Sequence, residues 1–177
     1  HEGEEELIVT KIKKLSKTFN DLLFIIVPRH INRSSEIQKY LYSKNINFKV
    51  RSKKEIIGKQ TFCYLADTIG EISLFFYIAK IVIIGGSYVN HGGQNPIEAS
   101  HFNCALIFGP YMQNFKKISE NLLDNHAAIK TDSSSIEKTI KDLMKNPKKI
   151  EKLSSNLNNF CLKERLAANA IWTELNM

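Results

Sequence analysis

The amino-acid sequence predicts an α/β fold, a Rossmann-like parallel sheet with helices on both faces. Short runs of consecutive apolar residues, such as residues 22–27 and 81–84, alternate along the chain with stretches of helical periodicity. Continuous apolar runs of this length are typical of strands that are buried on both faces of a parallel sheet. Strands that alternate with helices at such spacing favour the parallel arrangement.

The first half of the chain is expected to supply three strands and three helices. The helices are expected at residues 4–19, 34–42 and 70–79, and the strands at residues 22–27, 48–50 and 61–65. The first helix has acidic residues in its first turn and lysines in its last, which complements the helix dipole. Pro28 stops the first strand, so Arg29 and His30 should lie at its carboxyl end.

The second half of the chain repeats this alternation. Strands are expected at residues 81–84, 104–108 and 127–130, and helices at residues 95–102, 114–123 and 133–145. Ser133 is a favourable cap for the last of these helices. Asn146 and Pro147 are expected to begin two more helices that continue to the C-terminus.

Length and composition fit one globular domain. The 177 residues are enough to close a hydrophobic core, and 43% of them are hydrophobic and 24% charged, so we treat residues 1–177 as a single domain. Cys63, Cys104 and Cys161 lack the spacing of a metal site and are expected to be reduced core thiols. The formal net charge of +7 does not by itself distinguish a nucleic acid, an anionic membrane surface or an anionic ligand as the partner.

No segment is expected to cross a membrane, so the fragment is expected to be soluble. The longest apolar stretch, residues 72–86, is interrupted by Ser73 and Lys80 and is too short to span a bilayer. The first residues carry neither an initiator methionine nor a signal peptide, so the chain is expected to begin within a longer protein. The lysines between residues 138 and 152 form either a solvated helix face or a surface attracted to a membrane.

Residues 85–98 form the most informative segment, because they join the strongest predicted strand to a predicted helix. In an open parallel sheet, ligands bind beyond the carboxyl ends of the strands. Glycine pairs allow the backbone to approach a ligand closely, and a helix N-terminus favours a phosphate. Asn95 and Pro96 are a favourable cap and first-turn pair. The other residues of this loop that we expect near the ligand are Gly86, Ser87, His91, Gly92 and Gly93.

Glu98 has two interpretations. Its carboxylate in the first turn of the helix can accept hydrogen bonds from two vicinal ribose hydroxyls. The alternative is that Glu98 only caps the helix and the glycines only form a tight turn. Four glycines with His91, Asn95 and Glu98 within fourteen residues favour the binding site.

Two other loops should open onto the same edge of the sheet. Arg29, with His30 beside it, can clamp a phosphate or carboxylate, or it is a solvated arginine after a strand. The backbone amides of residues 69–71 face the same cleft. Asp67 or Thr68 before them is either the N-cap of the next helix or a ligand contact.

Four motifs in this order resemble the C-terminal half of the Kdo transferases of lipopolysaccharide synthesis, where Kdo is 3-deoxy-D-manno-octulosonic acid. The motifs are Val-Pro-Arg-His at 27–30, Leu-Ala-Asp-Thr-Ile-Gly-Glu at 65–71, Gly-Gly-Ser at 85–87 with His-Gly-Gly-Gln-Asn-Pro-Ile-Glu at 91–98, and Phe-Gly-Pro at 108–110 followed by Asn114 and Phe115. That family consists of GT-B glycosyltransferases, which have two facing Rossmann-like domains. The resemblance runs nearly end to end. Gln94 and Tyr111 stand where many relatives have histidine, and neither departure removes a donor or acceptor that phosphate binding needs.

The resemblance implies that the chain binds the donor substrate CMP-Kdo without a cofactor or a metal ion. It assigns the family's contacts to CMP to three loops, and the matching residues are Pro28, Arg29, Ile69, Gly70, Glu71, Asn95, Pro96, Ile97 and Glu98. The lipid A precursor, lipid IVA, and the catalytic base would belong to an N-terminal domain that this chain lacks. We therefore expect the fragment to bind nucleotide without turnover. The full-length enzyme would work on the membrane surface, at the cytoplasmic face of the bacterial inner membrane.

The implied reaction is an attack by a hydroxyl of lipid A on the anomeric carbon of CMP-Kdo, with inversion and departure of CMP. Arg29 and backbone amides would stabilise the charge on the departing CMP. One alternative is another GT-B enzyme, a UDP-sugar transferase or epimerase, since one fold supports many chemistries. The other is a basic nucleic-acid-binding module, which only the charge supports.

Overall fold

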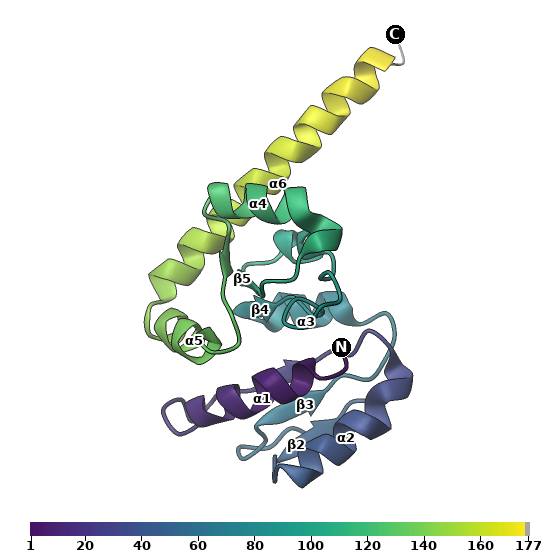
Figure 1. Cartoon of the computed structure of the whole chain (residues 1–177), viewed down its shortest axis with the longest axis vertical. Coiled ribbons are helices and arrows are strands. Elements are labelled where there is room, and N and C mark those ends of the chain that lie inside the picture. The colour runs from purple at the N-terminus through teal and green to yellow at the C-terminus, as the bar shows by residue number, and fades with distance from the viewer. Residues whose placement is uncertain (176–177) are drawn as a thin grey trace.

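A computed structural model of the chain describes the backbone of residues 1–175 and the side chains of residues 1–166. Within these residues, six short strands form two three-stranded parallel sheets, in the orders β1-β3-β2 and β4-β5-β6 (Figure 1). The strands are β1 (Phe24–Ile26), β2 (Phe48–Val50), β3 (Cys63–Leu65), β4 (Ile81–Ile83), β5 (Ala105–Phe108) and β6 (Ala128–Lys130).

Helices connect the strands, as the alternating pattern predicts. The α-helices are α1 (Glu4–Leu15), α2 (Ser34–Ser43), α3 (Ile72–Ile78), α4 (Lys116–Asp124), α5 (Ile136–Lys145) and α6 (Pro147–Leu175), and the 3₁₀ helices are η1 (Ile31–Arg33), η2 (Pro96–His101) and η3 (Gln113–Phe115). Because parallel strands need crossovers, a helix or a long loop lies between every two consecutive strands.

Side chains of β5, the central strand of the second sheet, alternate between two cores. In β5, Ala105 and Ile107 pack into the core that α1, α2 and α5 cover, while Leu106 and Phe108 pack into the core that η2, α4 and α6 cover. All four side chains are at most 1% exposed. Burial on both faces explains why these strands appear in the sequence as continuous apolar runs.

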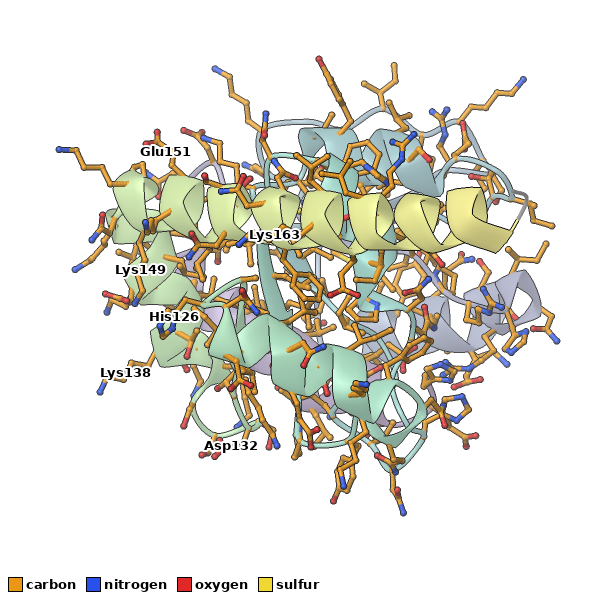
Figure 2. All side chains as sticks on the ribbon, turned by 90° about the horizontal axis from the view of Figure 1, so that it is seen from above. His126, Asp132, Lys138, Lys149, Glu151 and Lys163 are labelled. Carbon is orange, nitrogen blue, oxygen red and sulfur yellow. The ribbon has the colours of Figure 1, made fainter. Side chains whose placement is uncertain are left out.

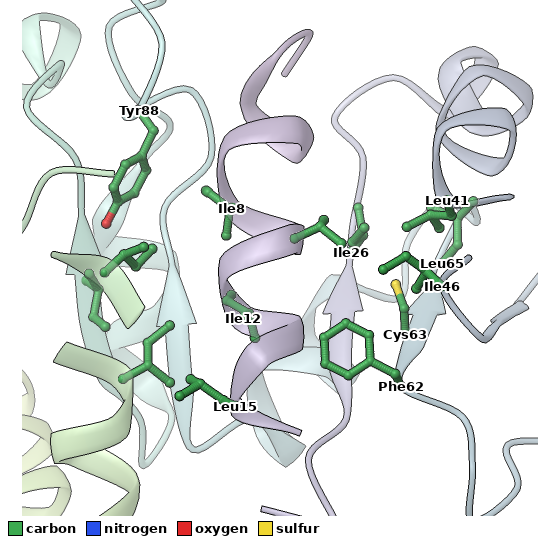
Figure 3. Close-up of a cluster of buried hydrophobic side chains, with 14 of the residues drawn as sticks. Ile8, Ile12, Leu15, Ile26, Leu41, Ile46, Phe62, Cys63, Leu65 and Tyr88 are labelled. Atoms are coloured by element: carbon green, nitrogen blue, oxygen red, sulfur yellow. The ribbon is translucent and has the colours of Figure 1, made fainter. Parts of the chain in front are cut away.

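Helix α1 joins the two sheets. Its residues Ile8, Ile12 and Leu15 are buried in one cluster with Ile26 of β1 and Ile107 of β5 (Figure 3). No strand pairing links β1 with β4 within residues 1–175. The single sheet expected from the sequence is therefore two half-sheets of equal size that side chains hold side by side.

Three predicted helical features differ in the structure. The helix expected at residues 95–102 is the 3₁₀ helix η2, which has six residues. The two helices expected after Asn146 are one helix, α6, which extends beyond the rest of the molecule (Figure 1). The helix expected from Ser133 begins at Ile136, with Ser135 at the N-cap position and no side-chain cap bond, and Asp132 accepts the backbone N–H groups of Ser134 at 2.8 Å and Ser135 at 2.9 Å in the turn before it.

The lysines of α5 and α6 are solvated. Lys138 and Lys149 extend from the edge of the molecule in Figure 2, and both of them and Lys163 are exposed. Lys149 also forms an ion pair with Asp142. Among the described residues, none of the helices combines the length and the apolar character that a membrane crossing needs.

Candidate functional site

The carboxylate of Asp67 connects the loops at the carboxyl ends of all three strands of the first sheet. It follows β3, and its carboxylate accepts hydrogen bonds from the hydroxyl of Ser34 at 2.5 Å, and from the N–H and hydroxyl of Ser52 at 2.9 and 2.8 Å. Ser34 lies beyond β1 and Ser52 beyond β2. Burial opposes ionisation, but these hydrogen bonds outweigh it and lower the pKa of Asp67. Asp67 therefore braces three loops and does not cap α3, which begins at Ile72.

The carboxylate of Glu71 is hydrogen-bonded to two other side chains of the protein. Its carboxylate accepts two hydrogen bonds from the guanidinium of Arg51, at 2.6 and 3.0 Å, and a third from the hydroxyl of Thr68. The Arg51 bonds, followed by the Thr68 bond, lower the pKa of Glu71 to about 2. The neighbouring backbone is open, since Ile69 is 80% exposed and nothing lies within 4 Å of where a Cβ would stand on Gly70. The segment at Ile69 and Gly70 is therefore accessible to a ligand, whereas the carboxylate of Glu71 is paired with Arg51.

The loop after β1 lies at the same edge as Gly70. Ile26 and Leu65 are in register, so the residues that follow β1 and β3 leave the sheet side by side. Pro28 is half-buried, while Arg29 and His30 are exposed. The guanidinium of Arg29 is therefore accessible to an anion from solvent.

Glu4 organises the glycine loop after β4. Glu4 is 4% exposed, and its carboxylate accepts hydrogen bonds from three successive backbone N–H groups, those of Gly86 at 2.7 Å and of Ser87 and Tyr88 at 3.0 Å each. The amino group of His1 donates a further bond at 3.2 Å. The amides of Gly86 and Ser87, which we expected near the ligand, are thus bonded to a side chain of the first helix.

The other glycines of this region allow loops to pack against each other. A Cβ on Gly92 would lie 2.4 Å from the Asn114 side chain, and one on Gly93 would lie 2.4 Å from the sulfur of Met112. Both glycines have positive φ, at 101° and 77°. Because both are buried, their close neighbours are protein side chains of the next loop. His91 is exposed and stacks on the ring of His1, with centroids 3.7 Å apart.

A hollow of about 350 Å³ lies between α3 and η2. Its walls include Ile72, Ser73 and Phe76 of α3, and Ile97 and Glu98 of η2. This hollow brings the segment after residues 69–71 together with the segment 95–98, as the sheet argument predicts.

Within η2, the predicted residues have different environments. The side-chain oxygen of Asn95 accepts the N–H of Ile97 at 3.0 Å, which confirms the cap that Asn95 and Pro96 predict. The Ile97 amide is therefore used within the loop, and Pro96 is buried. Glu98 is exposed at the rim of the hollow, so its carboxylate is accessible.

Sequence reasoning did not predict three sets of contacts. These are the bonds of the Glu4 carboxylate to the turn after β4, the bonds of Asp67 to the loops after β1 and β2, and the ion pair of Arg51 with Glu71. The one available signal for Glu4 is an acidic run at a helix start, which the helix dipole already explains. Among the described residues, no cluster of three or more His, Cys, Asp or Glu side chains is arranged to hold a metal ion.

Two solved structures share this fold. The C-terminal CMP-Kdo binding domain of WaaA from Acinetobacter baumannii aligns with a TM-score of 0.86 and 26% identity, over 91% of this chain and 84% of that one. The C-terminal domain of a glycosyl transferase group 1 family protein (LpcC) from Francisella tularensis aligns with a TM-score of 0.65 and 14% identity, over 93% of this chain and 81% of that one. The chain thus has the fold of a C-terminal domain of GT-B glycosyltransferases, which confirms the predicted fold class.

Curated sequences identify the family. The 3-deoxy-D-manno-octulosonic acid transferase of Haemophilus influenzae is 31% identical over 88% of this chain and 37% of its own length, and that of Rickettsia felis is 37% identical over 73% of this chain and 28% of its own length. No family profile matches the chain. The chain belongs to the Kdo transferase family, and it spans about a third of the length of these relatives.

Proposed function

We propose that this chain is the CMP-Kdo-binding domain of a Kdo transferase. The observation that carries the proposal is the hollow between α3 and η2, at the carboxyl edge of the sheets, in a fold that a CMP-Kdo binding domain shares. An apolar wall with a few accessible polar groups is the usual form of a small-ligand site. We treat residues 1–177 as one domain of a longer enzyme.

The ribose and the phosphate of CMP are each assigned to one feature of this edge. Glu98 accepts hydrogen bonds from the two ribose hydroxyls, because its carboxylate is exposed at the rim of the hollow. The open backbone at Gly70 allows the nucleotide to approach the main chain closely. The exposed guanidinium of Arg29 binds the phosphate and stabilises its charge as CMP departs. Ile69 and Glu71 contribute through the main chain, since Glu71 is paired with Arg51.

The full-length protein transfers Kdo from CMP-Kdo to the lipid A precursor, with inversion and without a metal ion or cofactor. The catalytic base and the acceptor site lie outside these residues, so the chain alone binds the donor without turnover. The enzyme acts at the cytoplasmic face of the inner membrane, where its lipid acceptor is found. The family assignment supports this proposal.

Calorimetric titration with paired ligands tests the site. The chain should bind CMP in preference to UMP, and it should prefer CMP to 2′-deoxyCMP by about tenfold, since a hydrogen bond to a charged group contributes ~1.5 kcal/mol or more. Glu98→Ala should abolish the preference for the ribose, whereas Glu151→Ala on the outer face of α6 should keep it (Figure 2). Arg29→Ala should weaken the binding of CMP, which carries the phosphate, but not the binding of cytidine.

Three outcomes would contradict the assignment. If Glu98→Ala prefers CMP over 2′-deoxyCMP as strongly as the wild type does, Glu98 does not bind the ribose. Preference for UMP would favour a UDP-sugar transferase or epimerase of the same architecture. Salt-dependent binding to DNA or RNA without mononucleotide binding would favour a nucleic-acid-binding module.

A further inference from the structure

The loop after β4 contains an anion-binding site that a side chain of the same chain fills. Consecutive backbone N–H groups that converge on one point form a concave site for an anion. Gly86, with φ of 71°, turns three such groups toward the carboxylate of Glu4, which comes from a helix more than 80 residues earlier in the sequence. A buried carboxylate with three donors is fully compensated, so this contact fixes both the helix and the loop.

A continuous set of backbone hydrogen bonds leads from this contact to the proposed nucleotide site. The carbonyl of Gly86 accepts the N–H of Gly93 at 2.9 Å, and the carbonyl of Gly85 accepts the N–H of Gln94 at 2.9 Å. Asn95 comes next and caps η2, in which Glu98 reaches the hollow. The position of Glu98 therefore depends on the same two peptide units, at residues 85 and 86, whose surroundings Glu4 fixes.

We propose that Glu4 is a positioning residue for the nucleotide site. Its carboxylate holds the Gly86–Tyr88 turn, and that turn holds residues 93–95 in the conformation that presents Glu98 to the ribose. The effect on the ribose rests on the proposed function of Glu98, while the effect on the loop does not.

The geometry is specific for a glutamate carboxylate. One oxygen accepts from Gly86, and the other accepts from both Ser87 and Tyr88. A glutamine at this position would turn an NH₂ group, which cannot accept, toward one of these donors. An alanine removes the two atoms beyond Cβ together with the oxygens, and acetate is the free fragment of the same shape.

The experiment compares Glu4→Ala and Glu4→Gln with two controls. Glu5→Gln alters the neighbouring carboxylate, which pairs with Arg33 at 2.8 Å, and Leu15→Ala removes a core side chain at the far end of α1. For each variant, CMP and 2′-deoxyCMP are titrated, and amide hydrogen exchange of residues 86–88, 93 and 94 is followed by NMR. Both measurements are repeated for Glu4→Ala with acetate added.

We expect both Glu4 variants to lose the roughly tenfold preference for CMP over 2′-deoxyCMP, because Glu98 is no longer held in place. We expect faster exchange at Gly93 and Gln94, and acetate should restore both properties in Glu4→Ala. Leu15→Ala should lose stability but keep the preference, which separates positioning from a general loss of stability. Glu4→Gln keeps the test informative if the alanine variant does not fold.

The proposal is overturned if folded Glu4 variants keep both the exchange protection of Gly93 and Gln94 and the wild-type preference for the ribose. A wild-type chain that binds no CMP, but whose Gly93 and Gln94 amides respond to Glu4→Ala and to acetate, would refute the proposed function alone. The role of Glu4 in ordering the loop would stand in that case.

Discussion

Replacement of Gly109 by alanine should separate the two loops that follow β4 and β5. A Cβ at Gly109 would lie 2.2 Å from the carbonyl oxygen of Ser87 and 2.6 Å from its carbonyl carbon. Non-bonded heavy atoms pack at ~3.5 Å or more, so the two backbones must separate by about 1 Å. The movement would stretch the bonds from the Gly109 N–H to the Ser87 hydroxyl, at 2.8 Å, and from the Tyr111 N–H to the Ser87 carbonyl, at 3.0 Å.

We expect Gly109→Ala to lower the free energy of unfolding by about 3 kcal/mol. Overpacking of this kind costs ~1–3 kcal/mol, and the weakened hydrogen bonds add to it. Urea denaturation measures the change, and Gly58→Ala is the matched control because nothing lies within 4 Å of a Cβ there. That control should be neutral or slightly stabilising. The reasoning is refuted if the two alanine variants unfold at the same urea concentration with equal slopes.

Three further results are expected. Asn95→Ala should lower the free energy of unfolding by ~1 kcal/mol because η2 loses its cap, and Asn95→Ser should retain most of the stability. An NMR titration should give Glu71 a pKa of about 2, which Arg51→Ala raises toward the ordinary value of ~4.3. The stability that this pair contributes is present above about pH 4 and is lost as the pH falls toward 2. Cys161, which is half-buried, should react with a thiol reagent in the native state, whereas Cys63 should react only on unfolding, because burial raises its pKa to about 12.

Each of these results has a clear contrary outcome. Equal stability of Asn95→Ala and Asn95→Ser would mean that the cap is not stabilising. An unchanged Glu71 titration in Arg51→Ala would mean that the ion pair does not form in solution. Equal labelling rates for Cys161 and Cys63 below the unfolding transition would contradict the burial of Cys63.

The sequence predicted the strands and their common edge because those features are encoded locally. A run such as residues 81–84 is apolar on every side chain, so only burial on both faces suits it. Once the strands are parallel, their carboxyl ends meet at one edge, which is consistent with the shared hollow of α3 and η2. The prediction of donor contacts at these residues itself rests on family resemblance and stays a prediction.

Features that depend on distant contacts were not predictable in the same way. The acids at residues 4–6 look alike in the sequence, yet Glu4 is buried in the turn after β4 while Glu5 pairs with Arg33. Ser133 is a good cap by residue type, yet α5 begins only at Ile136, because the carboxylate of Asp132 holds residues 134 and 135 in a turn before the helix. By contrast, the expectation of two helices after Asn146 was avoidable, since no glycine or proline follows Pro147 to interrupt α6.

The division of the sheet has a mechanical consequence. A ladder of peptide hydrogen bonds resists sliding, whereas packed side chains allow small shear displacements of one layer against another. Because no strand pairing joins β1 to β4 within the described residues, we expect small shear displacements between the two half-sheets that a continuous sheet would resist. Gly70 follows a strand of the first half-sheet, and Glu98 follows a strand of the second. A ligand that contacts both residues would therefore link the two half-sheets and restrict their movement relative to each other.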